Sequence, residues 1–99
     1  NKLVKILFDE VLYAEALQNY VVIHTVTKKY MTYLTFKSVE DYLPSDKFLK
    51  VHKSYIVAAS KIESIEGNDI RIGQQHIPVS RNQKDEVMDK LLKGKFLKR

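Results

Sequence analysis

The feature that most limits how this chain can fold is a series of short apolar runs separated by turn-forming residues. Residues 11–16, 20–26 and 30–36 are rich in Val, Ile, Thr and aromatic side chains, which favour β-strands. Asn19 and the lysine pair 28–29 lie between these runs, where a reversal of chain direction needs polar, turn-forming residues. The pattern therefore predicts antiparallel hairpins.

Several other segments are predicted as strands because apolar and polar residues alternate in them or because they are extended and apolar. The sequence "GND" at 67–69 and Gly73 are turn signals between the last three of these segments, and Pro78 suits an edge strand or a strand end. The segments are Lys2 to Phe8, Phe48 to Val51, Lys61 to Glu66, Ile70 to Ile72 and His76 to Val79.

Two segments change to helical periodicity. Residues 38–43 are predicted as a short helix that Ser38 caps and Pro44 ends. A longer C-terminal helix opens at Ser80 with a Ser-x-x-Gln capping box, and Gly94 is a candidate for its end, followed by a basic tail that frays. Helical spacing of apolar residues and two i,i+4 ion pairs support this helix. These residues are Val87, Met88, Leu91 and Leu92, and the pairs Glu86–Lys90 and Asp89–Lys93.

Together these elements predict a mainly β fold with roughly seven to ten short antiparallel strands, short helices and a C-terminal helix. The 99 residues suit a single domain over residues 1–99. No apolar run reaches the ~18 residues of a membrane span, so no membrane partner is expected.

The composition argues against catalysis and metal binding. The chain has no cysteine, which excludes a zinc finger and a thiol nucleophile and fits a cytoplasmic compartment. His24, His52 and His76 are far apart in sequence, and no nucleophile elbow or phosphate-binding glycine motif is present. A catalytic triad can be drawn from Ser54, His52 and Asp69, but no sequence motif supports it. We therefore expect no enzyme activity, no metal and no cofactor.

The net charge of +5 favours an acidic partner, such as nucleic acid, an anionic surface or an acidic protein; a basic domain with no such partner is the alternative. Three polar stretches interrupt the strand pattern, at Gln18 to Tyr20, His52 to Ser54 and Ser80 to Lys84. Amides, hydroxyls and cations at the ends of elements are the groups that contact phosphates and base edges. Each stretch also has a structural explanation, as an ordinary turn, a solvated lysine or a helix cap. The residues alone leave both interpretations open.

Three blocks of the chain resemble signature segments of the LytTR-type (LytR/AlgR) DNA-binding domain. They are "DEVLYAEALQNYVVIHT" (Asp9 to Thr25), "FLKVHKSYIVAASKIESIE" (Phe48 to Glu66) and "IPVSRNQKDEV" (Ile77 to Val87). The middle block is the most specific, and the three together cover nearly the whole chain in the family's order. One departure is that Ala58-Ala59 follow "YIV", where the family usually has Asn. We expect this change to alter a local turn or hydrogen bond and not DNA binding.

The resemblance implies an elongated sandwich of about ten short strands in small antiparallel sheets, with short helices. It also implies the cytoplasmic output domain of a bacterial two-component response regulator, which regulates transcription. A receiver domain usually precedes it and is not in this chain, which agrees with a start at Asn1 and not at methionine. Such domains bind promoter DNA, often as pairs on direct repeats, so a homodimer on DNA is expected. They insert loops into successive major grooves.

Carried over to this sequence, the motifs assign DNA contacts to the three polar stretches. The strongest implied base reader is in the last block, and a lysine in the middle block is the second. In the first block the family's loop length varies, so which residue between 18 and 20 reads bases stays open. The implied base contacts are Asn19, Tyr20, Lys53 and Arg81, and the implied phosphate contacts are Gln18, Ser54, Asn82 and Lys84.

His52 is expected to orient the middle loop or to pack against it, between neighbours that anchor the segment in the core. A small β module that docks another protein through a strand edge or the C-terminal helix is the alternative function. RNA is a further alternative, because exposed tyrosines such as Tyr20, Tyr33 or Tyr55 can stack on bases.

Overall fold

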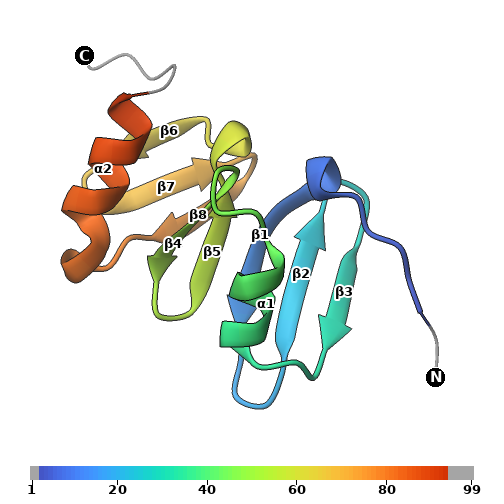
Figure 1. Ribbon diagram of the computed structural model, residues 1–99. Coiled ribbons are helices and arrows are strands. Elements are labelled where there is room, and N and C mark those ends of the chain that lie inside the picture. The colour runs from blue at the N-terminus through green and yellow to red at the C-terminus, as the bar shows by residue number, and fades with distance from the viewer. Residues whose placement is uncertain (1–2, 94–99) are drawn as a thin grey trace.

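The computed structural model describes residues 3–93, and this part of the chain contains eight strands, two α-helices and three 3-10 helices (Figure 1). It is mainly β and has a C-terminal helix, as predicted. The strands are β1 (Val11–Ala16), β2 (Val21–Thr25), β3 (Lys29–Thr32), β4 (Phe48–His52), β5 (Tyr55–Ala58), β6 (Ser64–Glu66), β7 (Asp69–Ile72) and β8 (Gln75–Pro78). The helices are η1 (Phe8–Glu10), α1 (Phe36–Tyr42), η2 (Ala59–Lys61), η3 (Arg81–Gln83) and α2 (Lys84–Leu92).

The strands form two antiparallel sheets. The larger sheet has the strand order β3-β2-β1-β5-β4, and the smaller has β6-β7-β8. Gly67 and Gly73 open the two hairpin loops of the smaller sheet with φ of 60° and 59°, a left-handed conformation that favours glycine at the first position of a type II′ loop. Pro78 lies in the edge strand β8, as predicted, where its missing N–H interrupts no interior ladder.

The larger sheet separates two hydrophobic clusters, because successive strand residues point to opposite faces. In β5, Ile56 packs in a cluster with Val39 of α1, whereas Val57 packs in a cluster with Ile70 of the smaller sheet and Val87 of α2. One face of the larger sheet is therefore covered by α1, and the other by the smaller sheet and α2 (Figure 1). These layers extend over 48 × 24 × 24 Å, which agrees with the expected elongated sandwich.

The predicted strand at residues 2–8 is wrong over its described part. Residues 3–7 have no regular structure, and Phe8–Glu10 form η1. An alternating run becomes a strand only where a neighbour takes its backbone hydrogen-bonding groups, and residues 3–7 pair with none of the described strands. Lys2 lies outside the described residues, as do Gly94 and the basic tail, for which a helix end and fraying were predicted.

The predicted strand at residues 30–36 is too long, and the predicted cap of the following helix is wrong. β3 ends at Thr32, and Phe36 begins α1. The cap is Thr35 and not Ser38, since the Thr35 Oγ1 accepts a hydrogen bond from the Ser38 N–H at 3.0 Å. Threonine is common in strands, but its hydroxyl can also accept a hydrogen bond from a free N–H at the start of a helix. At Thr35 this second property decides the local structure.

Two more boundaries differ by a few residues. The turn predicted at 28–29 covers residues 26–28, because the Thr25 Oγ1 accepts a hydrogen bond from the Lys28 N–H at 3.1 Å. Lys29 is therefore the first residue of β3. The strand predicted from Lys61 begins at Ser64, because η2 closes just before it.

Candidate nucleic-acid interface

The loop between β1 and β2, residues 17–20, is a tight reversal with an exposed tip. The Leu17 N–H donates to the Tyr20 carbonyl at 2.8 Å, which closes the loop, and both Gln18 and Asn19 are exposed at its tip. Tyr20 is half-buried, and its ring meets the ring of Tyr33 edge-on with 6.3 Å between the centroids. Two of the three predicted contact residues of this loop are therefore exposed, and the tyrosine is half-buried.

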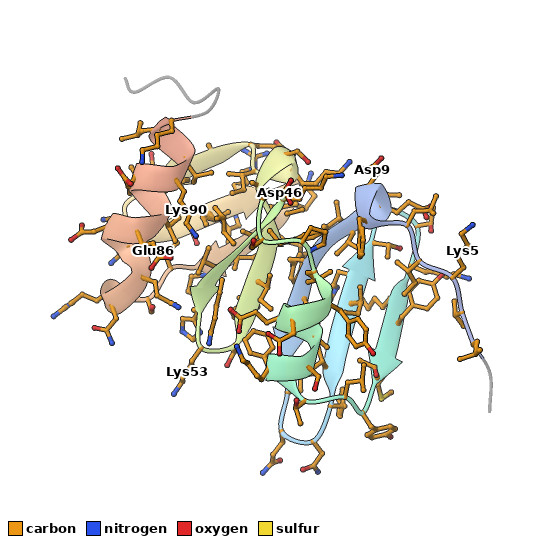
Figure 2. The ribbon with its side chains drawn as sticks, in the orientation of Figure 1. Lys5, Asp9, Asp46, Lys53, Glu86 and Lys90 are labelled. Atoms are coloured by element: carbon orange, nitrogen blue, oxygen red, sulfur yellow. The ribbon has the colours of Figure 1, made fainter. Side chains whose placement is uncertain are left out.

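The turn between β4 and β5, at Lys53 and Ser54, is anchored on both sides by the core. Val51 and Val57 are completely buried, while Lys53 is exposed and points away from the sheet (Figure 2). The His52 Nδ1 accepts a hydrogen bond from the Ser54 N–H at 3.1 Å. This bond ties His52 to the loop and supports the prediction that His52 orients the loop or packs against it.

Residues 80–84 lead from the smaller sheet into α2 and carry the third polar stretch. The predicted capping box does not form, because the Ser80 Oγ donates to the Gln83 Oε1 at 2.9 Å and does not accept the Gln83 N–H. That N–H donates to the Ser80 carbonyl at 3.1 Å, and the resulting 3-10 turn η3 takes the place of a side-chain cap. Arg81 and Asn82 are exposed on η3, and Lys84 is half-buried at the start of α2.

These three stretches lie along one edge of the molecule (Figure 1). The Ser54 carbonyl accepts the Ala16 N–H at 2.8 Å, which joins the middle turn to the first loop. The Val51 carbonyl accepts the Ser80 N–H at 2.8 Å, which joins β4 to the segment before η3. Neighbouring strands are about 4.8 Å apart, so the first loop and the middle turn, two strand spacings apart, are separated by about 10 Å. The β4–β5 turn is thus the centre of a short, fixed row.

Behind this edge, the Glu15 carboxylate links three neighbouring strands. Its Oε1 lies 3.1 Å from the His24 Nε2, and its Oε2 accepts the Tyr55 hydroxyl at 3.1 Å. Tyr13 stacks on the His24 ring with 4.1 Å between the centroids. Burial, and next the charge of Glu15, raises the pKa of Tyr13; burial, and next the hydrogen bond to Glu15, raises the pKa of Tyr55. Sequence reasoning missed this cluster, although a lone carboxylate inside the apolar run 11–16 was a usable signal.

A cleft of about 310 Å³ lies between α1 and α2, but its charges are balanced. The Glu40 carboxylate lies 3.9 Å from the Lys50 ammonium, and Glu86 lies 3.3 Å from Lys90 on α2 (Figure 2). The second of these pairs, like the pair Asp89–Lys93, was predicted and is confirmed. The cleft therefore offers little net charge to an anion, whereas the loop edge presents exposed cations.

Within residues 3–93 there is no group of three or more side chains that could hold a metal ion. Asp69 lies 2.5 Å from His76 on the smaller sheet, whereas His52 bonds to backbone, so the triad drawn from Ser54, His52 and Asp69 is not hydrogen-bonded together. None of the helices described is long and apolar enough to cross a membrane.

Comparison with solved structures gives the fold. The fold matches a LytTr DNA-binding domain from a Bacillus cereus protein described as a methyl-accepting/DNA response regulator, with a TM-score of 0.81 and 22% identity. The match covers 87% of this chain and 84% of the other. No curated protein matches the sequence significantly.

The sequence gives the family. It matches the LytTr DNA-binding domain over residues 1–92. The chain therefore belongs to the LytTR family of DNA-binding domains, as its three signature blocks predicted. It is a DNA-binding domain that acts in transcription regulation. Its described residues form eight strands, where about ten were expected.

Proposed function

We propose that this domain binds double-stranded promoter DNA sequence-specifically, as the cytoplasmic output domain of a two-component response regulator. The observation that carries the proposal is the row of three polar stretches along one edge, joined by the backbone hydrogen bonds of Ser54 to Ala16 and of Ser80 to Val51. A row that is fixed by backbone bonds presents its side chains to DNA with little further loss of conformational entropy.

Base reading is assigned to the exposed side chains of the row. Arg81 stands at one end, and its guanidinium can donate two hydrogen bonds to a guanine edge. Lys53 stands at the centre on a turn that the core holds from both sides. Asn19 stands at the other end, where its amide suits adenine, with Tyr20 beside it.

Phosphate contacts supply affinity and register rather than sequence information. The proposed phosphate contacts lie close in sequence to the base readers. They are Gln18 in the first loop, Ser54 in the middle turn, and Asn82 and Lys84 after Arg81. Lys84 is half-buried, so its charge is held near the start of α2.

The chain acts as one domain, since a single hydrophobic cluster joins both sheets and α2. Two copies would bind direct repeats as a homodimer on DNA, in a regulator that also carries a receiver domain. The likeness to a response-regulator domain supports this context.

The test is selection of bound sequences from a random DNA pool, followed by affinity measurements on the selected site. Arg81→Ala should cost about 1–3 kcal/mol on that site and relax one base position. The matched control is Lys47→Ala, an exposed lysine before β4, at the opposite end of that strand from Lys53, which should bind as the wild type does. Equal binding by the Arg81 variant would refute its role as a reader. Absence of all DNA binding at ~50 mM salt would refute the function and favour a protein-interaction module.

A further inference from the structure

The geometry points to a fourth DNA-contacting segment, which we propose is formed by Tyr33 and Lys37 beside the first loop. It rests on the proposed DNA-binding function and extends the row by one step. The expected ligand is the phosphate backbone next to the bases that the first loop reads. Neither residue belongs to the three polar stretches from which the interface was assigned.

The strand register brings this segment to the first loop. Thr32, the last residue of β3, pairs with Val21, the first residue of β2. The next residues outward are Tyr33 and Tyr20, so both leave the sheet at the same edge, and their rings contact each other at 68° with 6.3 Å between centroids. Figure 1 shows the β3–α1 loop beside the β1–β2 loop at this edge.

The β3–α1 loop is fixed at both ends. The Thr32 Oγ1 accepts the Leu34 N–H at 3.2 Å, and the Thr35 Oγ1 accepts the Ser38 N–H at 3.0 Å. Tyr33 between them is 78% exposed. A fixed loop that holds a tyrosine out into solvent presents a hydroxyl donor, which is a common contact to DNA phosphates.

Lys37 follows in the first turn of α1 and adds a positive charge. Its side chain is 76% exposed and its ammonium lies 3.3 Å from the Asp41 carboxylate. An exposed i,i+4 pair of this kind is weak, so a phosphate can draw the ammonium away from Asp41. Four strand spacings separate β3 from β4, or about 19 Å, so the part of the row that this sheet carries is shorter than one turn of B-DNA, about 34 Å.

The experiment measures affinity and its salt dependence on the site selected from the random pool. Lys37→Ala should lower the slope of log K against log salt by about 0.9, which corresponds to about eightfold weaker binding at ~0.1 M salt. Tyr33→Phe should weaken binding about threefold without changing the slope, because a neutral hydrogen bond is lost. Asp41→Asn should strengthen binding about twofold, and only while Lys37 is present.

Lys47→Ala is the matched control, because it removes the same charge from the opposite edge and should leave slope and affinity unchanged. Hydroxyl-radical footprints should show that the Lys37 variant loses protection only on the flank next to the first loop. If the Lys37 variant binds as the Lys47 variant does while Arg81→Ala binds weakly, the fourth segment is wrong and the proposed function stands. If the wild type binds no DNA, both are wrong.

Discussion

Replacing His52 by alanine should loosen the β4–β5 turn without removing an exposed cation. The change deletes the acceptor of the Ser54 N–H at 3.1 Å and the edge-on contact of the ring with Tyr55, whose centroids are 5.6 Å apart. The lost hydrogen bond contributes about 1 kcal/mol net, and the aromatic contact about 0.5–1.5 kcal/mol. The free energy of unfolding should therefore fall by about 2 kcal/mol, which a domain with ~5–15 kcal/mol survives.

The matched variant is His52→Asn. An asparagine side-chain oxygen can accept the N–H two residues further on, as in an Asx turn, so this variant should keep the hydrogen bond and lose only the ring contact. Its expected loss is about 1 kcal/mol. Urea unfolding measures both losses, and titration of the selected DNA site measures affinity. The alanine variant should bind several-fold more weakly, because Lys53 and Ser54 are then less ordered before binding.

Two results would refute this reasoning. If the alanine variant keeps both wild-type stability and wild-type DNA affinity, His52 does not position the turn. If the asparagine variant is as unstable as the alanine variant, the ring contact with Tyr55 holds the turn and the Nδ1 acceptor does not.

Three further predictions concern charge, backbone and pH. Lys84→Ala should weaken binding to selected and random DNA alike and lower the salt slope by about 0.9; an unchanged slope would show that Lys84 makes no phosphate contact. Gly67→Ala should cost about 1 kcal/mol, since φ is +60° and no atom lies within 4 Å of the added Cβ, so the cost is backbone strain alone; Gly67→Asn should cost less in the same urea assay. Because the pKa of Tyr55 is raised from 10.0 in the folded state, the stabilisation present below pH 10 is lost as pH rises through the folded pKa. Urea unfolding at increasing pH should show that the Tyr55→Phe variant loses less unfolding free energy above pH 10 than the wild type does. An equal loss in both proteins would contradict this sign.

Elements that depend on neighbouring residues could be predicted from the sequence. The apolar run 11–16 has the bounds of β1, and the glycines at 67 and 73 lie in the hairpin loops of the smaller sheet. The pairs Glu86–Lys90 and Asp89–Lys93 form because four residues of helix bring their side chains together. In each case the deciding interaction is local.

Elements that depend on a distant partner could not be predicted from the sequence. Residues 3–7 alternate like a strand but pair with no described strand. Ser80 and Thr35 are both residues that cap helices, yet the Thr35 hydroxyl accepts the helical N–H and the Ser80 hydroxyl bonds to the Gln83 side chain. Which of two chemically suitable partners a hydroxyl takes depends on backbone geometry that composition does not encode.

By itself, the sequence determined most of the strands, the hairpins, the family and the three polar stretches, because turn chemistry, periodicity and motifs depend on adjacent residues. Only the tertiary structure decided that these stretches form one row. The order β3-β2-β1-β5-β4 places the β4–β5 turn next to the β1–β2 loop, and a bond from Ser80 to Val51 brings up the third stretch. The same order adds Tyr33 to the edge and assembles Glu15, His24 and Tyr55 behind it. These contacts join residues 9 to 40 positions apart, and only burial of both faces of the larger sheet selects the strand order that makes them.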